Sequence, residues 1–306
     1  MKYINNTEIT QKKPSVVALG NFDGLHKGHK KLIQELQRQG NRLQAQEVIF
    51  SFFPHPAFVL GNRKDFQLIY TKDEKIRKMK KLGIHLYIEY PFTKQIAELD
   101  PRAFIEQVLY KQLQAKAIVI GENFRFGRNR KGNVDLLISV GKNLGFEVFG
   151  MPIVQFQEED VNSTLIRQYL KEGKMVEANE LLGEPYSIMG IVATGKQIGR
   201  TLGFPTANLI PPADKLLPTP GVYITEVLWN GKSWPSITNV GSNPTVSGSS
   251  PTVESYLLDF HENLYEKWIE VRFLDYLRPE VKFVSIADLK KAIKQDEQKA
   301  RIYFEY

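Results

Sequence analysis

In the first half of the chain, short apolar runs alternate with segments of helical periodicity. Runs of this length and uniform apolarity predict strands that are buried on both faces. The predicted strands cover residues 15–19, 47–52, 84–89, 117–120 and 146–150. Helices are predicted at residues 28–39, 72–82, 101–113, 133–144, 163–172 and 176–182. Because strand–helix–strand alternation is typical of parallel sheets with right-handed crossovers, this half belongs to the α/β class.

The second half is rich in β-type segments separated by turn residues. Strands are predicted at residues 187–194, 222–229, 232–240, 253–260 and 267–274. Asn230-Gly231 lies between two of them and predicts a tight hairpin, because a type I′ turn needs positive φ at both positions. Residues 241–252, rich in Pro, Gly and Ser, predict a mobile loop. Residues 285–288 have the form of a capping box and open a helix that runs to about residue 304.

The pattern therefore predicts an α/β domain with a parallel sheet, followed by a small antiparallel β-barrel with a C-terminal helix. We place the boundary at Gly-Glu-Pro, residues 183–185, which gives domains at residues 1–183 and 184–306. A length of 306 residues suits two domains. No internal repeat is evident.

Composition excludes several classes of protein. With 42% hydrophobic residues, 18 Phe and 13 Tyr, the chain can bury a sizeable core, which excludes a disordered protein. It has no run of 18 apolar residues, and its first ten residues lack the apolar region of a secretory signal. With 0 Cys, it can form neither a disulfide framework nor a zinc–thiolate site. We expect a soluble, cytoplasmic protein.

The charge balance is moderately basic, with 41 Lys and Arg against 34 Asp and Glu. A formal charge of +7 is compatible with an anionic ligand. The basic residues at 72–81 and 290–299 are mixed with acids, however, which is typical of solvated helix faces. An RNA-binding protein would need arginines interleaved with exposed aromatics, and only residues 125–131 approach that pattern. We expect small-molecule partners, with no nucleic acid and no membrane; the oligomeric state is not predicted.

The first candidate site lies at residues 17–29 (VALGNFDGLHKGH), where the first strand ends and the first helix begins. Gly20 and Gly24 let the backbone bend towards a ligand, and a helix start offers unpaired N–H groups to an anion. His26 and His29 are three residues apart, so both can face the same point and donate hydrogen bonds to phosphoryl oxygens. The alternatives are a Gly-rich turn with incidental histidines and a metal site. The position after the first strand, together with Asp23, favours nucleotide binding.

Residues 20–29 resemble the signature of the HxGH nucleotidyltransferases, and nearly the whole chain resembles the bacterial bifunctional riboflavin kinase/FAD synthetases. Further matches in the first half are residues 53–56 (FPHP), 121–127 (GENFRFG) and 163–167 (STLIR). The resemblance implies a Rossmann-like domain that transfers AMP from ATP to FMN, giving FAD and pyrophosphate. It also implies a second domain that phosphorylates riboflavin, with Mg²⁺ assisting both steps.

The resemblance also implies roles for individual residues of the first half. His26, His29 and Arg167 would act in catalysis, with Arg167 on the ATP phosphates that leave as pyrophosphate. The implied ligand-binding residues are Gly20, Phe22, Asp23, Gly24, Asn123, Phe124, Phe126, Ser163 and Thr164. From residue type alone, Phe124 and Phe126 either contact a flat ring or belong to the core, and His55 is either structural or lines the substrate.

Asn162 departs from the family pattern, which usually has a serine at that position. The departure affects a contact through residue 162, not the implied role of Arg167.

The second candidate site begins at residues 190–208 (GIVATGKQIGRTLGFPTAN), which resemble the riboflavin kinase signature. Residues i and i+2 of an extended segment share a face, so Thr206 and Asn208 present two oxygen donors to the same side. Hard oxygen donors with partial protein coordination suit Mg²⁺ bound beside nucleotide phosphates. The remaining implied ligand-binding residues of this segment are Gly195, Gly199, Arg200, Gly203 and Phe204.

Glu254 is the candidate general base of the second half. It is the one carboxylate on an otherwise apolar face of the predicted strand at residues 253–260, where partial desolvation suits proton abstraction. The pattern alone also allows an exposed glutamate at the start of the strand. The resemblance assigns the matching glutamate to the proton of the riboflavin 5′-hydroxyl, and it implies that Asn239 and Arg278 line the flavin and nucleotide pockets.

Two departures from the family pattern lie in this half: Tyr256, where a histidine is common, and residues 263–266 (NLYE). They affect flavin affinity and turn geometry more than the reaction. Because both motif sets look intact, a two-site enzyme is favoured over a protein that keeps one activity.

Overall fold

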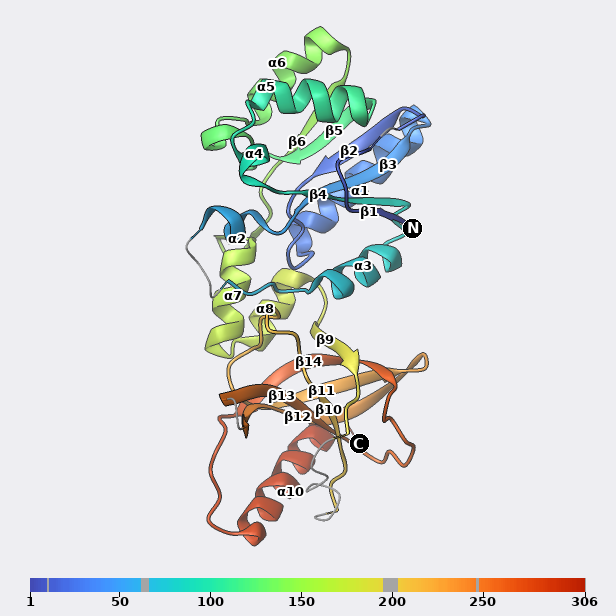
Figure 1. Ribbon diagram of the computed structural model, residues 1–306. Helices are drawn as coiled ribbons and strands as arrows, with labels where there is room; N and C mark the ends of the chain where they lie inside the picture. The colour runs from blue at the N-terminus through green and yellow to red at the C-terminus, as the bar shows by residue number, and fades with distance from the viewer. Residues whose placement is uncertain (10, 62–65, 195–202, 246–247, 306) are drawn as a thin grey trace. The chain divides into compact units, whose positions relative to one another are not determined.

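The computed structural model describes residues 1–9, 11–61, 66–194, 203–245 and 248–305 (Figure 1). Contacts divide the chain into two compact units, each described here by itself. The first comprises Met1–Leu68 and Lys72–Ser163, and the second comprises Ile69–Thr71 and Thr164–Tyr306. This division falls earlier in the chain than the boundary at residues 183–185, which stays a prediction about the functional domains.

The first unit is built on a six-stranded parallel sheet with the order β1-β4-β3-β2-β5-β6. The strands are β1 (Lys2–Ile4), β2 (Ser15–Leu19), β3 (Gln46–Phe53), β4 (Leu86–Pro91), β5 (Ala115–Gly121) and β6 (Glu147–Met151). The chain runs from β2 outward to β4 and then crosses back to β5, so the strand order reverses between β2 and β5. In open α/β sheets, ligands bind beyond the carboxyl ends of the strands at such a switch. The predicted Rossmann-like class is confirmed.

Helices connect the strands of the first unit. They are α1 (Lys27–Leu43), α2 (Pro56–Leu60), α3 (Lys72–Lys81), α4 (Lys94–Ala97), α5 (Pro101–Phe104) and α6 (Val134–Leu144). Asp100 caps α5 by accepting from the backbone N of Arg102 at 2.9 Å. The predicted helix at residues 101–113 continues from α5 as a π-helix, η1 (Ile105–Gln112). A short 3₁₀ turn, η2 (Arg128–Arg130), and a hairpin of β7 (Gln155–Phe156) and β8 (Glu159–Asp160) complete this unit.

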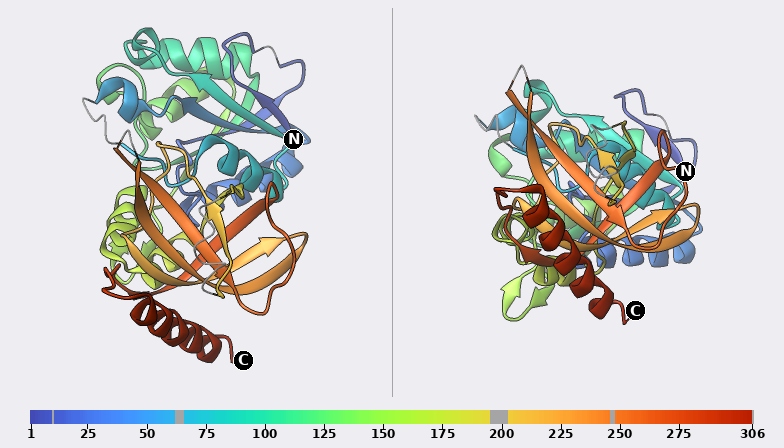
Figure 2. Two further views of the ribbon diagram at one scale, coloured as in Figure 1. Left: turned by 60° about the horizontal axis from the view of Figure 1, so that its bottom comes forward. Right: turned by 90° about the horizontal axis from the view of Figure 1, so that it is seen from below.

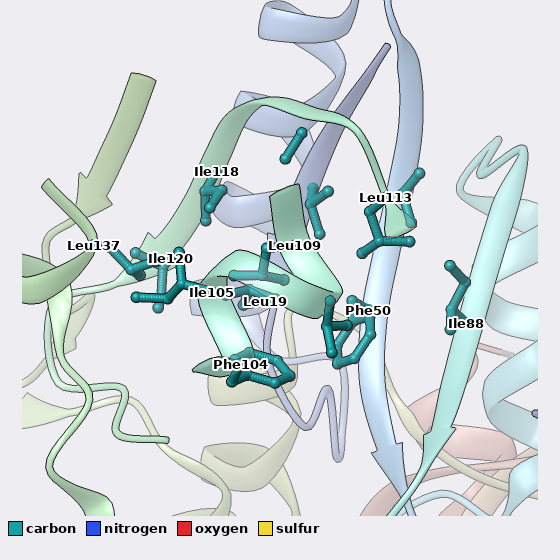
Figure 3. Close-up of a cluster of buried hydrophobic side chains, with 14 of the residues drawn as sticks. Leu19, Phe50, Ile88, Phe104, Ile105, Leu109, Leu113, Ile118, Ile120 and Leu137 are labelled. Carbon is teal, nitrogen blue, oxygen red and sulfur yellow. The ribbon is translucent and has the colours of Figure 1, made fainter. Parts of the chain in front are cut away.

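The core of the first unit lies between η1 and the sheet. Figure 3 shows Ile105, Leu109 and Leu113 of this region gathered against side chains of β2 to β5, among them Leu19 and Phe50. All of these side chains are buried, as is every residue of β2. A strand buried on both faces is held rigidly, so the turn that follows β2 starts from a fixed point.

The second unit contains an antiparallel sheet with the order β10-β13-β12-β11-β14-β9. Its strands are β9 (Tyr186–Ile191), β10 (Thr206–Leu209), β11 (Gly221–Trp229), β12 (Lys232–Thr245), β13 (Gly248–Leu257) and β14 (Trp268–Arg278). A bridge between Ala193 and Asn208 joins its two ends and closes the barrel. Asn230 and Gly231 have φ of 51° and 76°, which confirms the predicted hairpin turn.

The prediction of a loop at residues 241–252 is wrong for the residues of this range that the structure describes. There β12 and β13 continue as a paired ribbon, with Gly241 opposite Thr252 and Thr245 opposite Gly248. Beyond Val240 and Val253, neither strand pairs with a further neighbour among the residues that the structure describes, so within that part of the chain each has an unpaired outer edge. A proline whose nitrogen faces a free edge removes no ladder hydrogen bond, which is why a Pro-rich segment can extend this hairpin.

Helix α10 (Ile286–Tyr303) packs on the outer face of the barrel and confirms the predicted C-terminal helix (Figure 2). Its Ala300 is buried against Ile224 of β11 and Ile237 of β12. The Ser285 hydroxyl caps the helix by accepting from the backbone N of Asp288 at 3.1 Å. The helices α7 (Ser163–Glu172) and α8 (Met175–Leu182) precede the barrel. Within the described residues, no helix is long and apolar enough to cross a membrane.

Candidate active sites

The turn after β2 brings the first candidate residues together. Phe22 and Leu25 have φ of 49° and 46°, and Gly24 has φ of 87°, so the backbone here is left-handed at three positions. A Cβ on Gly20 would lie 3.1 Å from the Phe22 ring, which is tighter than an ordinary contact. Glycine at position 20 therefore lets Phe22 fold back under the turn, where its side chain is buried.

His26 and His29 stack at the start of α1, with ring centroids 3.7 Å apart and planes inclined by 24°. His26 is the N-cap of this helix, and its Nδ1 accepts from the backbone N–H of His29 at 3.4 Å. A Cβ on Gly28 would lie 3.1 Å from the His26 ring, so glycine at this position makes room for the stack. The two imidazoles thus share one place at the positive end of the α1 dipole, as the spacing predicts.

Both histidines are held in the neutral form. Burial lowers the pKa of His26 to about 4, against an opposing effect of the Asp23 carboxylate. Burial, followed by the charges of His26 and Lys75, lowers the pKa of His29 well below its ordinary value. Because Nδ1 of neutral His26 accepts a hydrogen bond, its proton resides on Nε2, which is then a donor. Within the described chain, Nδ1 of His29 is buried without a hydrogen-bond partner.

Ser163, at the C-terminal end of the first unit's sequence, contacts the same turn. Its hydroxyl donates to the backbone carbonyl of Asp23 at 2.8 Å. This contact ties residue 163 to the turn after β2, while its implied role in ligand binding stays a prediction. Thr164 and Arg167 lie on α7 and group with the second unit, where Arg167 is half-buried.

A cavity of about 430 Å³ opens beyond the carboxyl ends of the strands. Aromatic side chains dominate its lining: Phe52 from the end of β3, Phe92 after β4, and Phe104, Phe124 and Phe126. Phe126 is also part of the core at 4% exposure, which confirms that alternative for this residue, whereas its contact with a flat ring stays a prediction. A cavity with several aromatic side chains in its lining suits a planar ring system.

Sequence reasoning missed several residues of this cavity. Asn21 lines it, and among the described residues its Oδ1 is buried without a hydrogen-bond donor. The predicted Asn123 is exposed instead. Asn21 stands inside the GNFDG motif, so the signal was present, whereas Phe52 and Phe92 belong to strand ends that carry no motif.

The residues around the first site have structural roles as well. His55 is the N-cap of α2, where its Nδ1 accepts from the backbone N of Ala57 at 3.2 Å, and its ring stacks on Phe66. Arg125 donates to the backbone carbonyls of Glu122 and Phe124 at 3.0 and 2.9 Å. These contacts stabilise the loops that border the cavity.

The second candidate site lies on the outer face of the barrel. Strand register places Asn208 of β10 opposite Glu254 of β13, and Glu254 opposite Asn239 of β12. Directly opposite residues of antiparallel strands have their side chains on one face, so these three form a row. All three side chains are half-buried. The register confirms that Glu254 shares a face with Tyr256, but β13 ends at Leu257, so the predicted continuation of this face to Leu258 and Phe260 is wrong.

Thr206 and Tyr256 form the adjacent row, two residues along their strands. The Asn208 amide donates to the Thr206 carbonyl at 3.2 Å and to its hydroxyl at 3.4 Å, which leaves the amide oxygen directed elsewhere. Phe204 is buried and meets the Tyr256 ring edge-on at 5.3 Å. Tyr256 therefore helps to hold the segment that carries Thr206 and Asn208.

Other predicted residues of the second half are placed as follows. Gly203 has φ of 89°, a conformation that favours glycine. Gly195, Gly199 and Arg200 lie outside the described residues. Arg278 forms a bidentate ion pair with the buried Asp296 of α10, with nitrogen–oxygen distances of 2.7 to 3.1 Å. In this arrangement Arg278 anchors the C-terminal helix to the barrel.

Comparisons with known proteins agree with both sites. A family model for FAD synthetase matches residues 8–165, and one for riboflavin kinase matches residues 182–304. A bifunctional riboflavin kinase/FMN adenylyltransferase of Escherichia coli K12 is 35% identical over 98% of this chain and 96% of its own. The protein of that name from Bacillus subtilis is 33% identical over 95% of this chain and 92% of its own.

Among solved structures, a crystal structure described as a macrolide-efflux protein from Streptococcus pneumoniae aligns with a TM-score of 0.87 and 32% identity. The alignment covers 98% of each chain. The sequence matches, the family models and the two sites converge on one conclusion. The chain belongs to the bifunctional riboflavin kinase/FMN adenylyltransferase family: its N-terminal part is an FAD synthetase domain, its C-terminal part is a riboflavin kinase domain, and its substrates are ATP, riboflavin and FMN.

Proposed function

We propose that FMN is adenylylated at the turn between β2 and α1, with the ATP phosphates at the start of α1 and the flavin ring in the aromatic cavity. The observation that carries this assignment is the stacked histidine pair at a helix start, with His26 buried, His29 half-buried and both rings neutral. Two buried polar atoms without partners in the described chain, Asn21 Oδ1 and His29 Nδ1, are groups that a ligand satisfies. Asn123, Phe124 and Ser163 complete the proposed site within the first unit, and the roles of Thr164 and Arg167 stay predictions from the sequence motif.

The chemistry at this site requires no covalent intermediate. A phosphate oxygen of FMN forms a bond to the α-phosphorus of ATP, and the bond to the β-phosphate oxygen breaks as pyrophosphate leaves. The attacking oxygen is already ionised, so no base has to remove a proton. The protein orients the two phosphates and stabilises the charge that moves onto pyrophosphate. His26 contributes a donor at Nε2, and α1 contributes its unpaired N–H groups.

For the kinase reaction we propose Glu254 as general base. It takes the proton from the 5′-hydroxyl of riboflavin, whose oxygen then forms a bond to the γ-phosphorus of ATP while ADP leaves. Glu254 is flanked across the sheet by Asn208 and Asn239, so the base lies beside polar groups that can hold a substrate hydroxyl and a phosphate. Gly195, Gly199, Arg200 and Gly203 form the proposed phosphate loop.

The oxygen donors at this place fit Mg²⁺. Thr206 Oγ1 and Asn208 Oδ1 lie two residues apart on one strand face, and the amide nitrogen of Asn208 points back to Thr206. Two hard oxygens with room for phosphate and water are the partial coordination that Mg²⁺ accepts. When bound, the ion neutralises charge on the transferring phosphate. Because both reactions consume ATP, the proposed location is the cytoplasm.

A pair of variants tests the division of labour. The pure protein is incubated with riboflavin, ATP and Mg²⁺, and the flavins are separated by chromatography. His29→Ala is expected to stop FAD formation while FMN accumulates. Glu254→Gln is expected to slow FMN formation by roughly 10²–10⁴-fold, with added FMN still converted to FAD. Equal loss of both reactions in each variant contradicts two separate sites.

A further inference from the structure

A buried ion pair lies in the first unit, outside the site described above. The Lys75 ammonium of α3 is 2.8 Å from Glu89 Oε1 on β4, with side-chain exposures of 10% and 0%. The Tyr87 hydroxyl donates to the same oxygen at 2.6 Å, and the Tyr3 hydroxyl donates to Oε2 at 2.7 Å. Three groups from three elements, α3, β1 and β4, thus converge on one carboxylate.

The carboxylate is ionised in this place. Burial raises the pKa of Glu89, but the Lys75 charge and the two tyrosine hydroxyls outweigh it and bring the pKa below its ordinary value. An ion pair withdrawn from water costs desolvation energy, and apolar residues of similar volume are often as stabilising. The stability of the fold alone therefore gives only a weak reason for the presence of these four polar groups. The alternative is that they position other residues.

Ser51 connects the ion pair to the nucleotide-binding turn. It is fully buried on β3, next to Glu89 in the strand register. Its hydroxyl donates to the backbone carbonyl of Asn21 at 3.2 Å. Because Ser51 and Glu89 are directly opposite on neighbouring strands, the ion pair lies beside the residue that holds the Asn21 backbone.

The lysine acts on the same turn through its charge. Lys75 is one of the groups that lower the pKa of His29, after burial and the neighbouring His26. The Asp23 carboxylate acts on the histidine pair in the opposite direction, because it opposes the effect of burial on the pKa of His26. A fixed ammonium near His29 disfavours a second positive charge there.

We propose that Glu89 and Lys75 are positioning residues of the adenylyltransferase site: the pair fixes the Asn21 backbone through Ser51 and holds an ammonium near His29. The proposal rests on the assignment of FMN adenylylation to this turn. Neither residue touches the reacting atoms. Their effect is to keep the Asn21 turn and the histidine stack in the geometry that the two phosphates need.

The test uses the full chain and compares Ser51→Ala, the double variant K75M/E89Q and the control Lys72→Met. Lys72 lies on the same helix, 5.1 Å from the Tyr3 ring centroid, so its loss removes one positive charge from α3 but leaves the Lys75–Glu89 pair. For each protein, kcat and KM for ATP and FMN are measured in FAD formation, and riboflavin phosphorylation serves as the internal control. Histidine ring titrations are followed by NMR, with the His29 signal assigned from His29→Ala.

Ser51→Ala and K75M/E89Q are each expected to lower kcat/KM for FAD formation by about tenfold or more, since small misplacements near reacting phosphates are costly. Riboflavin phosphorylation is unchanged. The titration midpoint of His29 rises in K75M/E89Q and stays in place in Lys72→Met. Lys75→Arg, which keeps the charge, retains the wild-type midpoint.

Wild-type kcat and KM in Ser51→Ala, or an equal rise of the His29 midpoint in Lys72→Met, overturns the proposal. If K75M/E89Q does not fold, Ser51→Ala decides, because it removes one hydroxyl and leaves the ion pair intact. If His29→Ala still forms FAD, the assignment of FMN adenylylation to this turn is refuted. If His29→Ala loses FAD formation but Ser51→Ala forms FAD at the wild-type rate, only the positioning role is refuted.

Discussion

Acid is expected to destabilise the first unit through His26. The imidazole is 8% exposed, and burial holds its pKa at about 4, against 6.5 in the unfolded chain. Between these two values the unfolded chain binds a proton that the folded chain does not. The contribution of neutral His26 to the free energy of unfolding is therefore fully present above pH 6.5 and decreases as the pH drops towards 4. Below pH 4 both the folded and the unfolded chain bind the proton, and this contribution is lost.

The expected loss is about 3 kcal/mol, since one pKa unit corresponds to about 1.4 kcal/mol. A matched variant removes the His26 titration. His26→Asn keeps a side-chain acceptor for the backbone N–H of His29 and so preserves the N-cap, but it does not titrate. Because His29 stacks on His26 and its pKa responds to His26, the difference between the two proteins reports on the coupled pair, while the contributions of distant groups cancel.

The assay has to report on the first unit alone. All 3 Trp residues lie in the barrel, at positions 229, 234 and 268, so tryptophan fluorescence follows the second unit and serves as the control. Amide hydrogen exchange of β2 and β5 in increasing urea follows the first. Wild type is expected to lose about 3 kcal/mol more than His26→Asn between pH 7 and pH 4. Parallel stability curves for the two proteins would refute a buried neutral His26.

Three further outcomes are expected. Asn208→Ala raises the Mg²⁺ concentration for half-maximal FMN formation by about tenfold or more, and leaves the Mg²⁺ dependence of FAD formation unchanged; an equal change in both contradicts a metal site at β10. Phe124→Ala raises KM for FMN in FAD formation by about tenfold, through lost stacking, with KM for riboflavin in the kinase assay unaffected. Asp296→Asn leaves the Arg278 charge without its partner and lowers the free energy of unfolding of the second unit by about 3–5 kcal/mol, read from tryptophan fluorescence at increasing urea.

Local patterns in the sequence predicted the elements that local physics determines. The parallel strands of the first unit are near-continuous apolar runs, the caps at Asp100 and Ser285 use their own side chains, and Asn230-Gly231 supplies two positive φ values. The histidine pair was also predictable, because residues three apart on a helix start share a face. These features depend on neighbours within a few residues.

What sequence reasoning missed depends on distant neighbours. The three-residue β1 is a strand only because it pairs with β4, and residues 241–252 extend a hairpin because each strand supplies the other's hydrogen bonds. Arg278 was predicted from its motif as a pocket residue, whereas the pairing with Asp296 becomes evident only when α10 folds onto the barrel. The cavity aromatics Phe52 and Phe92 come from separate strand ends that the parallel sheet aligns.

The two proposed sites differ in the way that their chemistries require. In FMN adenylylation the nucleophile is a phosphate oxygen that carries no proton at neutral pH, so a general base has nothing to remove. Neutral imidazoles at a helix start then suffice, because the site needs hydrogen-bond donors for charge that moves onto pyrophosphate. In riboflavin phosphorylation the nucleophile is an alcohol whose proton has to leave as the bond to phosphorus forms. A carboxylate, Glu254, stands at that place instead, beside the oxygen donors Thr206 and Asn208. Exchanging the two arrangements would leave the kinase site without a base and the adenylyltransferase site with a carboxylate facing a triphosphate.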